Sequence, residues 1–244
     1  MPTVNVAALW HDLECGGYRE DLPAWRALAA ATGGPVLDVG AGTGRVTLDL
    51  AAEGFDVVAL DRDAALLAAL EHRARGLAVE TVHADAHEFE LARRFSLILV
   101  PMQTLQLLDG RAGREAFLRC ASAHLHPGGI VAAALADAMD CFDDEHSVPP
   151  PPEVRDVAEV RYSSQLLAVV EECGRAALCR RREITDSTRR RDAEDVVLHL
   201  DRVSAEQVAA EALPLGLVGE DPRYVPETEQ YLGSTIVILR KPRQ

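Results

Sequence analysis

The stretch at residues 36–45, which reads VLDVGAGTGR, constrains the fold of this chain more than any other. A short apolar run leads into glycines at every second position, and a segment with helical spacing of apolar residues begins at Arg45. This order predicts a strand, a tight turn and a helix. Glycine suits such a turn because it adopts positive φ without strain and lets another group come close to the backbone. The turn is therefore either a site for a polar ligand or a tight connection that binds nothing.

An acid at the end of the next apolar run favours the first alternative, a site for a polar ligand. Residues 55–61 read FDVVALD, which places Asp61 21 positions beyond Gly40. A carboxylate at about that separation, roughly 20 residues, meets the hydroxyl pair of a ribose in nucleotide-binding sheets. Dinucleotide-binding turns read G-x-G-x-x-G, whereas here the third glycine comes one position early, at Gly44. The glycine spacing therefore argues against a pyrophosphate ligand, whereas the position of Asp61 still favours a ribose.

Three segments in this order resemble the motifs of the class I S-adenosylmethionine-dependent methyltransferases. Residues 36–44 resemble the first motif of that family, Asp61 its ribose acid, and His83-Ala84-Asp85-Ala86 the motif after its third strand. The resemblance implies S-adenosylmethionine as the cofactor and S-adenosylhomocysteine as its product. It also implies a set of cofactor-binding residues, which are Tyr18, Asp38, Gly40, Ala41, Gly42, Thr43, Gly44, Asp61, Arg62, Asp85, Ala86 and Met102.

Besides Asp61, four of these residues have a role implied by the family, and three of the four have a plainer alternative. Asp38 helps to hold the methionine ammonium group, or as a buried acid it only satisfies turn amides. Asp85 accepts a hydrogen bond from the adenine amine, or it caps the segment that follows. Tyr18 leans on the cofactor, or it belongs to the core. The backbone carbonyl of Met102 faces the methionine ammonium group.

The residues that meet the substrate are less constrained by the motifs. Gln103 and Gln106 follow the fourth expected strand, at the carboxyl edge where open α/β sheets bind ligands, and are predicted to face the substrate. The alternative is that both amides satisfy loop backbone. His146 is a candidate general base because the pKa of histidine lies near working pH, and the alternative is a surface histidine. No metal is expected.

Alternation of short apolar runs with helical stretches predicts a parallel sheet covered on both faces. The fold class is therefore α/β, a doubly wound, Rossmann-like, seven-stranded sheet that is mostly parallel with an antiparallel last strand, and with an antiparallel β insertion after strand five. Strands are expected at residues 36–39, 57–60, 78–83, 96–100, 130–135, 157–172, 176–185, 195–203, 216–224 and 232–240. Helices are expected at residues 7–31 with a break at 15–17, and at 45–53, 64–75, 114–126 and 204–213.

Four segments follow from this reading. Residues 1–35 form an N-terminal helical cap, and residues 36–136 form the cofactor-binding core. Residues 137–200 form a lid and the antiparallel insertion, with an acidic, proline-rich stretch at 137–152 on the substrate side. Residues 201–244 supply a helix and the final strand pair of the same sheet.

Composition excludes several partners and compartments. A net charge of −14 opposes a polyanion, because nucleic-acid binders need a basic face. No segment is long and apolar enough to span a bilayer, and the five cysteines contain no C-x-x-C pair. We therefore expect a cytoplasmic protein without nucleic-acid or membrane partners, as a monomer or homodimer. A single lysine, Lys241, among 25 basic residues hints at a GC-rich bacterial genome.

The function predicted from these observations is in-line methyl transfer from S-adenosylmethionine to a small-molecule nitrogen, oxygen or carbon nucleophile. Alignment and desolvation are the main contributions of such an enzyme, so no catalytic triad is expected. One alternative is a non-methylating S-adenosylmethionine-binding protein, cyclase-like or regulatory. A nicotinamide-dependent oxidoreductase is a third, and both the glycine spacing and Asp85 argue against it.

Overall fold

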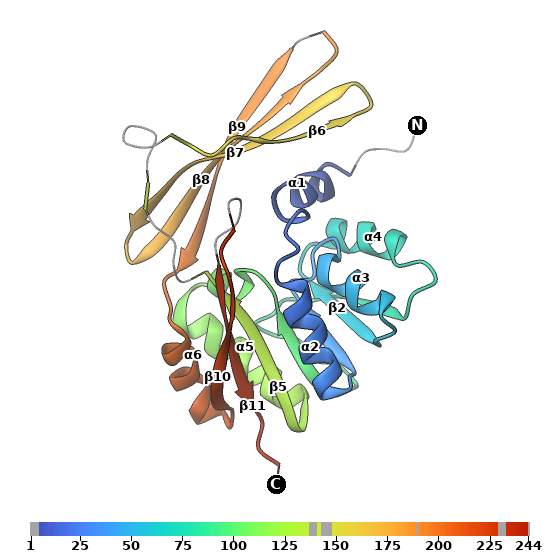
Figure 1. Cartoon of the computed structure of the whole chain (residues 1–244), viewed down its shortest axis with the longest axis vertical. Helices are drawn as coiled ribbons and strands as arrows, with labels where there is room; N and C mark the ends of the chain where they lie inside the picture. The colour runs from blue at the N-terminus through green and yellow to red at the C-terminus, as the bar shows by residue number, and fades with distance from the viewer. Residues whose placement is uncertain (1–4, 137–140, 143–147, 189, 229–232, 244) are drawn as a thin grey trace.

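The computed structural model describes residues 5–136, 141–142, 148–188, 190–228 and 233–243. Two β-sheets organise these residues (Figure 1). The larger sheet has the strand order β10-β11-β5-β4-β1-β2-β3, and the smaller has the order β6-β7-β8-β9.

The larger sheet is parallel from β1 to β5, and β11 runs antiparallel to β5 and β10. Its strands are β1 (Val36–Val39), β2 (Val57–Asp61), β3 (Val79–His83), β4 (Phe95–Val100), β5 (Leu125–Leu135), β10 (Val218–Val225) and β11 (Ser234–Arg240). This arrangement confirms the predicted fold class. Because all the parallel strands point the same way, the segments after β1, β2, β3 and β4 meet at one edge, which is where the predicted site residues lie.

Helices cover both faces of the larger sheet. They are α1 (Val6–Cys15), α2 (Leu22–Thr32), α3 (Arg45–Ala52), α4 (Ala64–Arg73), α5 (Gly110–His124) and α6 (Ala205–Ala212), with short 3₁₀ turns η1 (Thr104–Leu107) and η2 (Leu213–Leu215). Successive β1 residues point to opposite faces: Val36 joins the cluster around Trp25 of α2, and Leu37 joins the cluster around Phe117 of α5. Burial on both faces explains why β1 is apolar along most of its length.

The smaller sheet lies beyond the carboxyl edge of the larger one (Figure 1). Its antiparallel strands are β6 (Glu153–Val157), β7 (Val160–Glu172), β8 (Arg175–Thr185) and β9 (Arg191–Asp201). Helix α1 packs on it through an edge-to-face contact of Trp10 with Tyr162, whose ring centroids are 5.5 Å apart. Glu14 of α1 adds hydrogen bonds of 2.7 Å with Ser164 and Arg182. Helix α1 is therefore held against the smaller sheet, and it also contacts α4.

Two expected elements differ from the structure. The strand expected at residues 157–172 corresponds to β7, which begins at Val160. A strand that was not expected, β6, precedes it and pairs with it through a turn at Ala158 and Glu159, which both have positive φ. Two left-handed residues match the twist of a two-residue hairpin even without the usual Asn or Gly. The helix expected at residues 114–126 ends at His124, and β5 begins at Leu125 rather than at the expected residue 130. Within β5, Lys241 N donates to Gly129 O at 2.9 Å and Gly128 N donates to Lys241 O at 2.8 Å.

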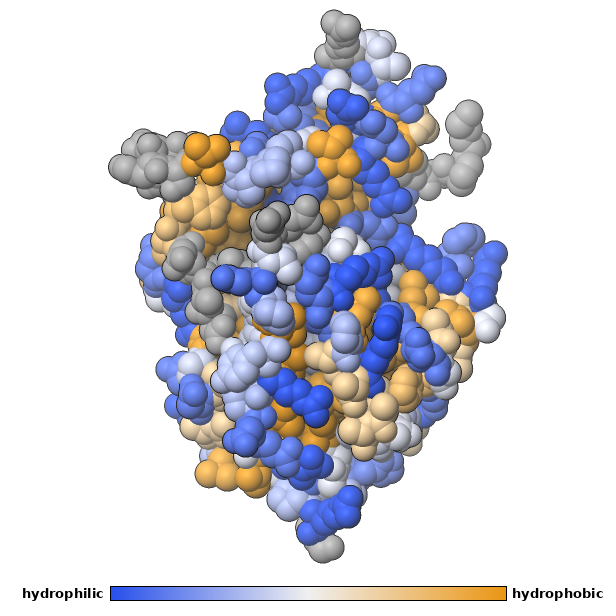
Figure 2. Space-filling view, viewed as in Figure 1, coloured by the Kyte–Doolittle hydropathy of each residue, from blue (hydrophilic) through white to orange (hydrophobic). Residues whose placement is uncertain are grey.

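Within the described ranges, no helix combines the length and the apolar character needed to cross a membrane. Hydrophilic side chains are spread over much of the face shown in Figure 2, with hydrophobic ones between them.

Candidate functional site

The glycine turn after β1 has the backbone that its sequence predicts. Gly40, Gly42 and Gly44 have φ values of 72°, 56° and 93°, and α3 begins at the next residue, Arg45. The amides of Gly40 and Ala41 donate to the carbonyl of Leu60, at 2.8 and 3.1 Å. Left-handed backbone at all three positions accounts for the spacing of the glycines, because other residues are strained there.

Side chains from three other elements of the chain lie very close to the glycines of the turn. A Cβ at Gly40 would lie 2.5 Å from Cγ2 of Thr104, in η1. One at Gly42 would lie 2.2 Å from Nε2 of His11, in α1. One at Gly44 would lie 2.2 Å from Cδ1 of Leu70, in α4. The glycines thus let three surrounding elements pack directly on the turn.

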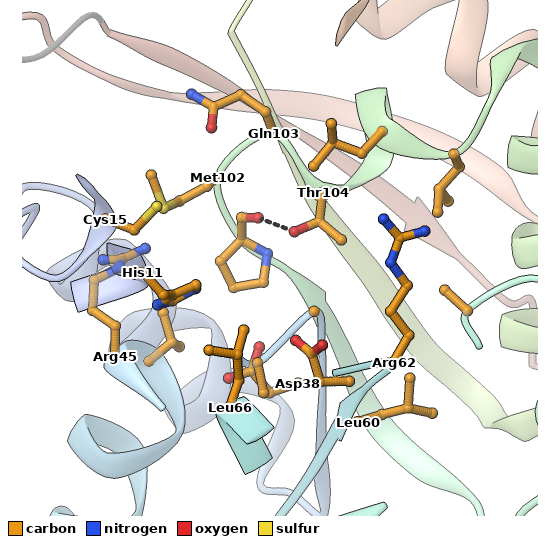
Figure 3. Close-up of a pocket in the computed structure, with 18 of the residues that line it drawn as sticks. His11, Cys15, Asp38, Arg45, Leu60, Arg62, Leu66, Met102, Gln103 and Thr104 are labelled. Carbon is orange, nitrogen blue, oxygen red and sulfur yellow. Dashed lines mark hydrogen bonds between the residues drawn. The ribbon is translucent and has the colours of Figure 1, made fainter. Parts of the chain in front are cut away.

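A cavity of about 280 Å³ opens beside this turn, at the carboxyl edge of the larger sheet (Figure 3). Of the residues predicted from the sequence, it brings together Asp38, Gly40, Ala41, Asp61, Arg62, Asp85, Ala86, Met102 and Gln103. Their roles toward a ligand stay predictions, but their convergence from the ends of β1, β2, β3 and β4 is a property of the fold.

Asp38 carries an unusual unpaired oxygen. Its Oδ2 accepts a 2.6 Å hydrogen bond from the hydroxyl of Thr47, in α3. Its Oδ1 is buried, and no group among the described residues donates to it. Burial raises the pKa of the Asp38 carboxyl to about 6. A buried carboxylate oxygen without a donor is costly, so this position favours a cationic or hydrogen-bond-donating ligand.

Asp61 holds the glycine turn from the end of β2. Its Oδ2 accepts from the Gly42 amide at 2.7 Å, and its Oδ1 accepts from the Asp63 amide at 2.9 Å. The side chain is 8% exposed and lines the cavity. A carboxylate has about four lone-pair sites, so both oxygens keep capacity for further donors.

Asp85, after β3, is paired with a residue that the sequence did not indicate. Its Oδ1 accepts from the His87 amide at 2.8 Å and lies 2.5 Å from Nδ1 of the His87 ring. The donated backbone bond is the main reason that the pKa of Asp85 is lowered. Both residues line the cavity. Asp85 therefore organises the turn that follows it, which is not the helix that the plainer alternative expected, and it also lines the cavity.

The loop after β4 closes the cavity on another side. Met102 has a left-handed backbone with a φ of 55°, which is uncommon for a residue with a side chain. The hydroxyl of the following Thr104 donates to the carbonyl of Pro101 at 3.0 Å (Figure 3). Figure 3 shows Met102 and Gln103 at the rim, with Cys15 and His11 on the same side as Met102.

Two predicted site residues lie elsewhere. Gln106 is 2% exposed, and its amide accepts from Ala136 N at 2.8 Å and donates to the carbonyls of Ala136 and Asp201, at 3.2 and 2.9 Å. The prediction that Gln106 faces the substrate is wrong, because its polar atoms bond to backbone. Tyr18 belongs to the core cluster and lies under the Arg45 guanidinium, 5.2 Å from the ring centroid. It does not line the cavity, which corrects its expected contact with the cofactor.

Gly42, Thr43 and Gly44 lie in the turn but do not line the cavity. His146, the candidate base, lies outside the described residues.

Several lining residues were not predicted to be part of the site. Among them are His11 and Cys15 of α1, Arg45, His87, Thr104, and Leu198 of β9 in the smaller sheet. Burial raises the pKa of the Cys15 thiol to about 11, so the thiol is not a nucleophile at neutral pH. The apolar spacing around residues 9–13 indicated a helix, and nothing in that pattern separates His11 from an ordinary helix residue.

A parallel sheet with a glycine turn after β1, an acid ending β2 and an acid after β3 defines an α/β protein that binds a ribose-containing ligand at its carboxyl edge. Residues 36–129 match a family model described as a methyltransferase domain. The match covers less than half of the chain, and over these residues it confirms the resemblance to methyltransferases that the motifs predicted.

Known proteins similar to this chain carry related names. A cypemycin N-terminal methyltransferase from Streptomyces is 33% identical over 111 residues, which is 46% of this chain and 43% of that protein. A demethylmenaquinone methyltransferase from Clavibacter sepedonicus is 33% identical over 132 residues, covering 53% of this chain and 48% of that protein. The matches thus span about half the length of these relatives.

Solved structures match nearly the whole chain. A sugar N-methyltransferase from Streptoalloteichus has a TM-score of 0.72 at 18% identity, covering 100% of this chain and 94% of that one. An S-adenosylmethionine-dependent methyltransferase from Clostridium acetobutylicum has a TM-score of 0.71 at 15% identity, covering 97% and 98%. At these identities the likeness establishes a shared fold, in which the smaller sheet is included.

Proposed function

We propose that this chain binds S-adenosylmethionine in the cavity and transfers its methyl group to a nitrogen, oxygen or carbon nucleophile of a small molecule. The observation that carries the proposal is the buried, unpaired Oδ1 of Asp38, beside the glycine turn of a methyltransferase domain. The primary ammonium group of S-adenosylmethionine would supply the hydrogen-bond donor that this oxygen lacks, together with a positive charge.

The other lining residues fit the remaining parts of that cofactor. Asp61, with lone pairs to spare on both oxygens, would accept from the two ribose hydroxyls. Asp85 and the amide of Ala86 would meet the adenine, and the backbone around Met102 would bound the methionine part. The bound cofactor supplies a methyl group on a good leaving group, so the chain's own task is to align the nucleophile and exclude water.

A small acceptor is favoured by the surroundings of the cavity. Leu198 of β9 lines the cavity from the smaller sheet, so residues of both sheets bound this space. The net charge of −14 opposes a nucleic acid. The same charge favours a neutral or cationic acceptor. The relatives named as cypemycin N-terminal and sugar N-methyltransferases support nitrogen as the atom that accepts the methyl group.

Two measurements test this function. Isothermal titration calorimetry with S-adenosylmethionine, S-adenosylhomocysteine and NAD should show binding of the two sulfur compounds and none of NAD. Transfer of a labelled methyl group should then occur to members of a panel of small amines and phenols, and not to tRNA or rRNA at physiological salt. Binding of NAD alone would refute the cofactor assignment. Binding of S-adenosylmethionine without transfer to any compound would favour the non-methylating alternative.

A further inference from the structure

His11 is a titratable group at the cavity that no motif explains. It lies on α1, and its ring covers Gly42 of the glycine turn, with Nε2 nearest to the turn. Figure 3 shows it beside Arg45 and Cys15, on the same side of the cavity as Met102. Its other ring nitrogen, Nδ1, lies 3.2 Å from the hydroxyl oxygen of Thr43.

The hydrogen bonds around Thr43 fix the tautomer of His11. The Thr43 hydroxyl donates its only proton to Oδ1 of Asp12, at 2.7 Å. Burial opposes ionisation of Asp12, but hydrogen bonds from Arg73 and Thr43 outweigh it and lower the pKa of Asp12, so this carboxylate is an acceptor. Nδ1 of His11 must therefore carry a proton and donate it to Thr43. In the neutral ring, Nε2 is then left with a lone pair.

The charges around His11 suit a group that gains a proton during a reaction. Burial lowers the pKa of His11 below its usual value, so the ring is neutral at pH 7. Arg45 acts in the same direction, whereas Asp61, Asp12 and Glu14 raise the pKa. These three carboxylates would stabilise an imidazolium once it forms.

The other titratable side chains of the cavity are less suited to this task. The Cys15 thiol has a pKa of about 11 and stays protonated. The Nδ1 of His87 is held by Asp85, and its Nε2 lies 3.4 Å from the carbonyl of Leu108. Asp38 would be occupied by the cofactor's ammonium group.

We propose that His11 is the proton acceptor of the methyl transfer proposed above, and that Thr43 and Asp12 position it. As the nucleophile forms its bond to the methyl carbon and the sulfur–carbon bond breaks, the nucleophile's proton moves to Nε2 of His11. Nδ1 keeps its proton and its bond to Thr43. The positive charge thereby passes from sulfur to the imidazolium, beside Asp61 and Asp12. This inference rests on the proposed function. It also requires that the substrate atom that receives the methyl group carries a proton before the transfer.

His11→Asn is the variant that tests the role, because its side-chain NH₂ can still donate to Thr43 but no atom takes the place of Nε2. Thr43→Val removes the bond that fixes the tautomer, and Thr43→Ser keeps the hydroxyl as the matched control. The probes are methyl-labelled S-adenosylmethionine with small amines and phenols, S-adenosylhomocysteine for binding, and ¹⁵N NMR of the full chain for the tautomer.

The expected result has three parts. NMR finds the proton on Nδ1 of His11 and none on Nε2 at pH 7. His11→Asn leaves the Kd for S-adenosylhomocysteine within about threefold and lowers the transfer rate by about 10²-fold or more, the usual contribution of a general base. In the unaltered chain the transfer rate rises with pH, governed by a group with a pKa below 6.5. This rise is kept in Thr43→Ser and is lost in both His11→Asn and Thr43→Val.

Three outcomes would overturn the proposal. One is a proton on Nε2, and another is an unchanged rate in His11→Asn. The third is a higher Kd with an unchanged rate at saturation, which would make His11 a cofactor-binding residue. If the unaltered chain binds S-adenosylmethionine and methylates nothing in the panel, the proposed function fails and this inference fails with it.

Discussion

The hydroxyl of Thr47 donates a 2.6 Å hydrogen bond to Oδ2 of Asp38 and so joins the first helix after the glycine turn to the strand before it. This bond satisfies one carboxylate oxygen and leaves the other, Oδ1, buried without a donor among the described residues. The bond holds the Asp38 carboxylate in place at the wall of the cavity, which is how a side chain is organised before its ligand arrives.

Cofactor affinity should depend on pH through Asp38. Its pKa is about 6 in the chain alone, and an ammonium group at Oδ1 would lower that pKa, so binding favours the carboxylate. The Kd for S-adenosylhomocysteine should be flat above pH 7 and rise by about tenfold between pH 7 and pH 5. Calorimetry at a series of pH values measures this. Asp38→Asn should bind more weakly at pH 7 and lose most of the pH dependence, and an unaltered chain with equal Kd at pH 5 and 7 would contradict the role of Asp38.

Gly42→Ala should destabilise the chain more than Gly33→Ala. Both glycines have positive φ, 56° and 77°, so each substitution costs about 1–2 kcal/mol of backbone strain. Only at Gly42 does the new methyl group meet a side chain, His11, which must move and give up its bond to Thr43. The extra cost should be about 1 kcal/mol in the free energy of unfolding, measured by chemical denaturation. Equal losses for the two variants would show that His11 moves freely.

Asp61→Ala should weaken cofactor binding and also lower stability. The cofactor's ribose would lose charge-assisted hydrogen bonds, raising the Kd about tenfold to a hundredfold. The amides of Gly42 and Asp63 lose their acceptors as well, at about 1–3 kcal/mol of stability for each one that stays buried and unpaired. Asp63→Ala is the control. The side chain of Asp63 caps α4 by accepting hydrogen bonds from the amides of Ala65 and Leu66, and its loss should cost about 1 kcal/mol of stability. The Kd of Asp63→Ala should be unchanged, and an unchanged Kd in Asp61→Ala would place the ribose elsewhere.

The sequence predicted the parts of the site that depend on local spacing. Residues 36–45 determine the strand, the left-handed turn and the start of α3 by themselves, because positive φ at alternate positions needs glycine. The positions of Asp61 and Asp85 follow from short apolar strands that end at the same edge of a parallel sheet. The order of the five parallel strands did not need to be known for this.

The residues that the sequence missed depend on packing between distant segments. His11 precedes Thr43 by 32 positions and meets it only because α1 lies over the glycine turn. Leu198 reaches the cavity from the smaller sheet, and its strand pattern gives no sign of that. Gln106 was predicted at the substrate because it follows β4, but the 3₁₀ turn η1 directs it into the interior, toward Ala136 and Asp201. The direction in which a side chain of such a short turn points cannot be predicted from the pattern of apolar residues.

Gln106→Leu and Gln103→Leu should therefore separate stability from substrate contact. Gln106 bonds to the ends of β5 and β9, so its replacement leaves the Ala136 amide and two carbonyls without their partner. We expect a loss of about 2 kcal/mol or more in the free energy of unfolding, with an unchanged Kd for S-adenosylhomocysteine. Gln103 lines the cavity, and Gln103→Leu should change stability by about 0.5 kcal/mol or less while altering the KM for a methyl acceptor. Chemical denaturation and calorimetry on both variants make the comparison. A stable Gln106→Leu variant with an altered acceptor KM would restore Gln106 to the substrate side and show that its buried bonds are dispensable.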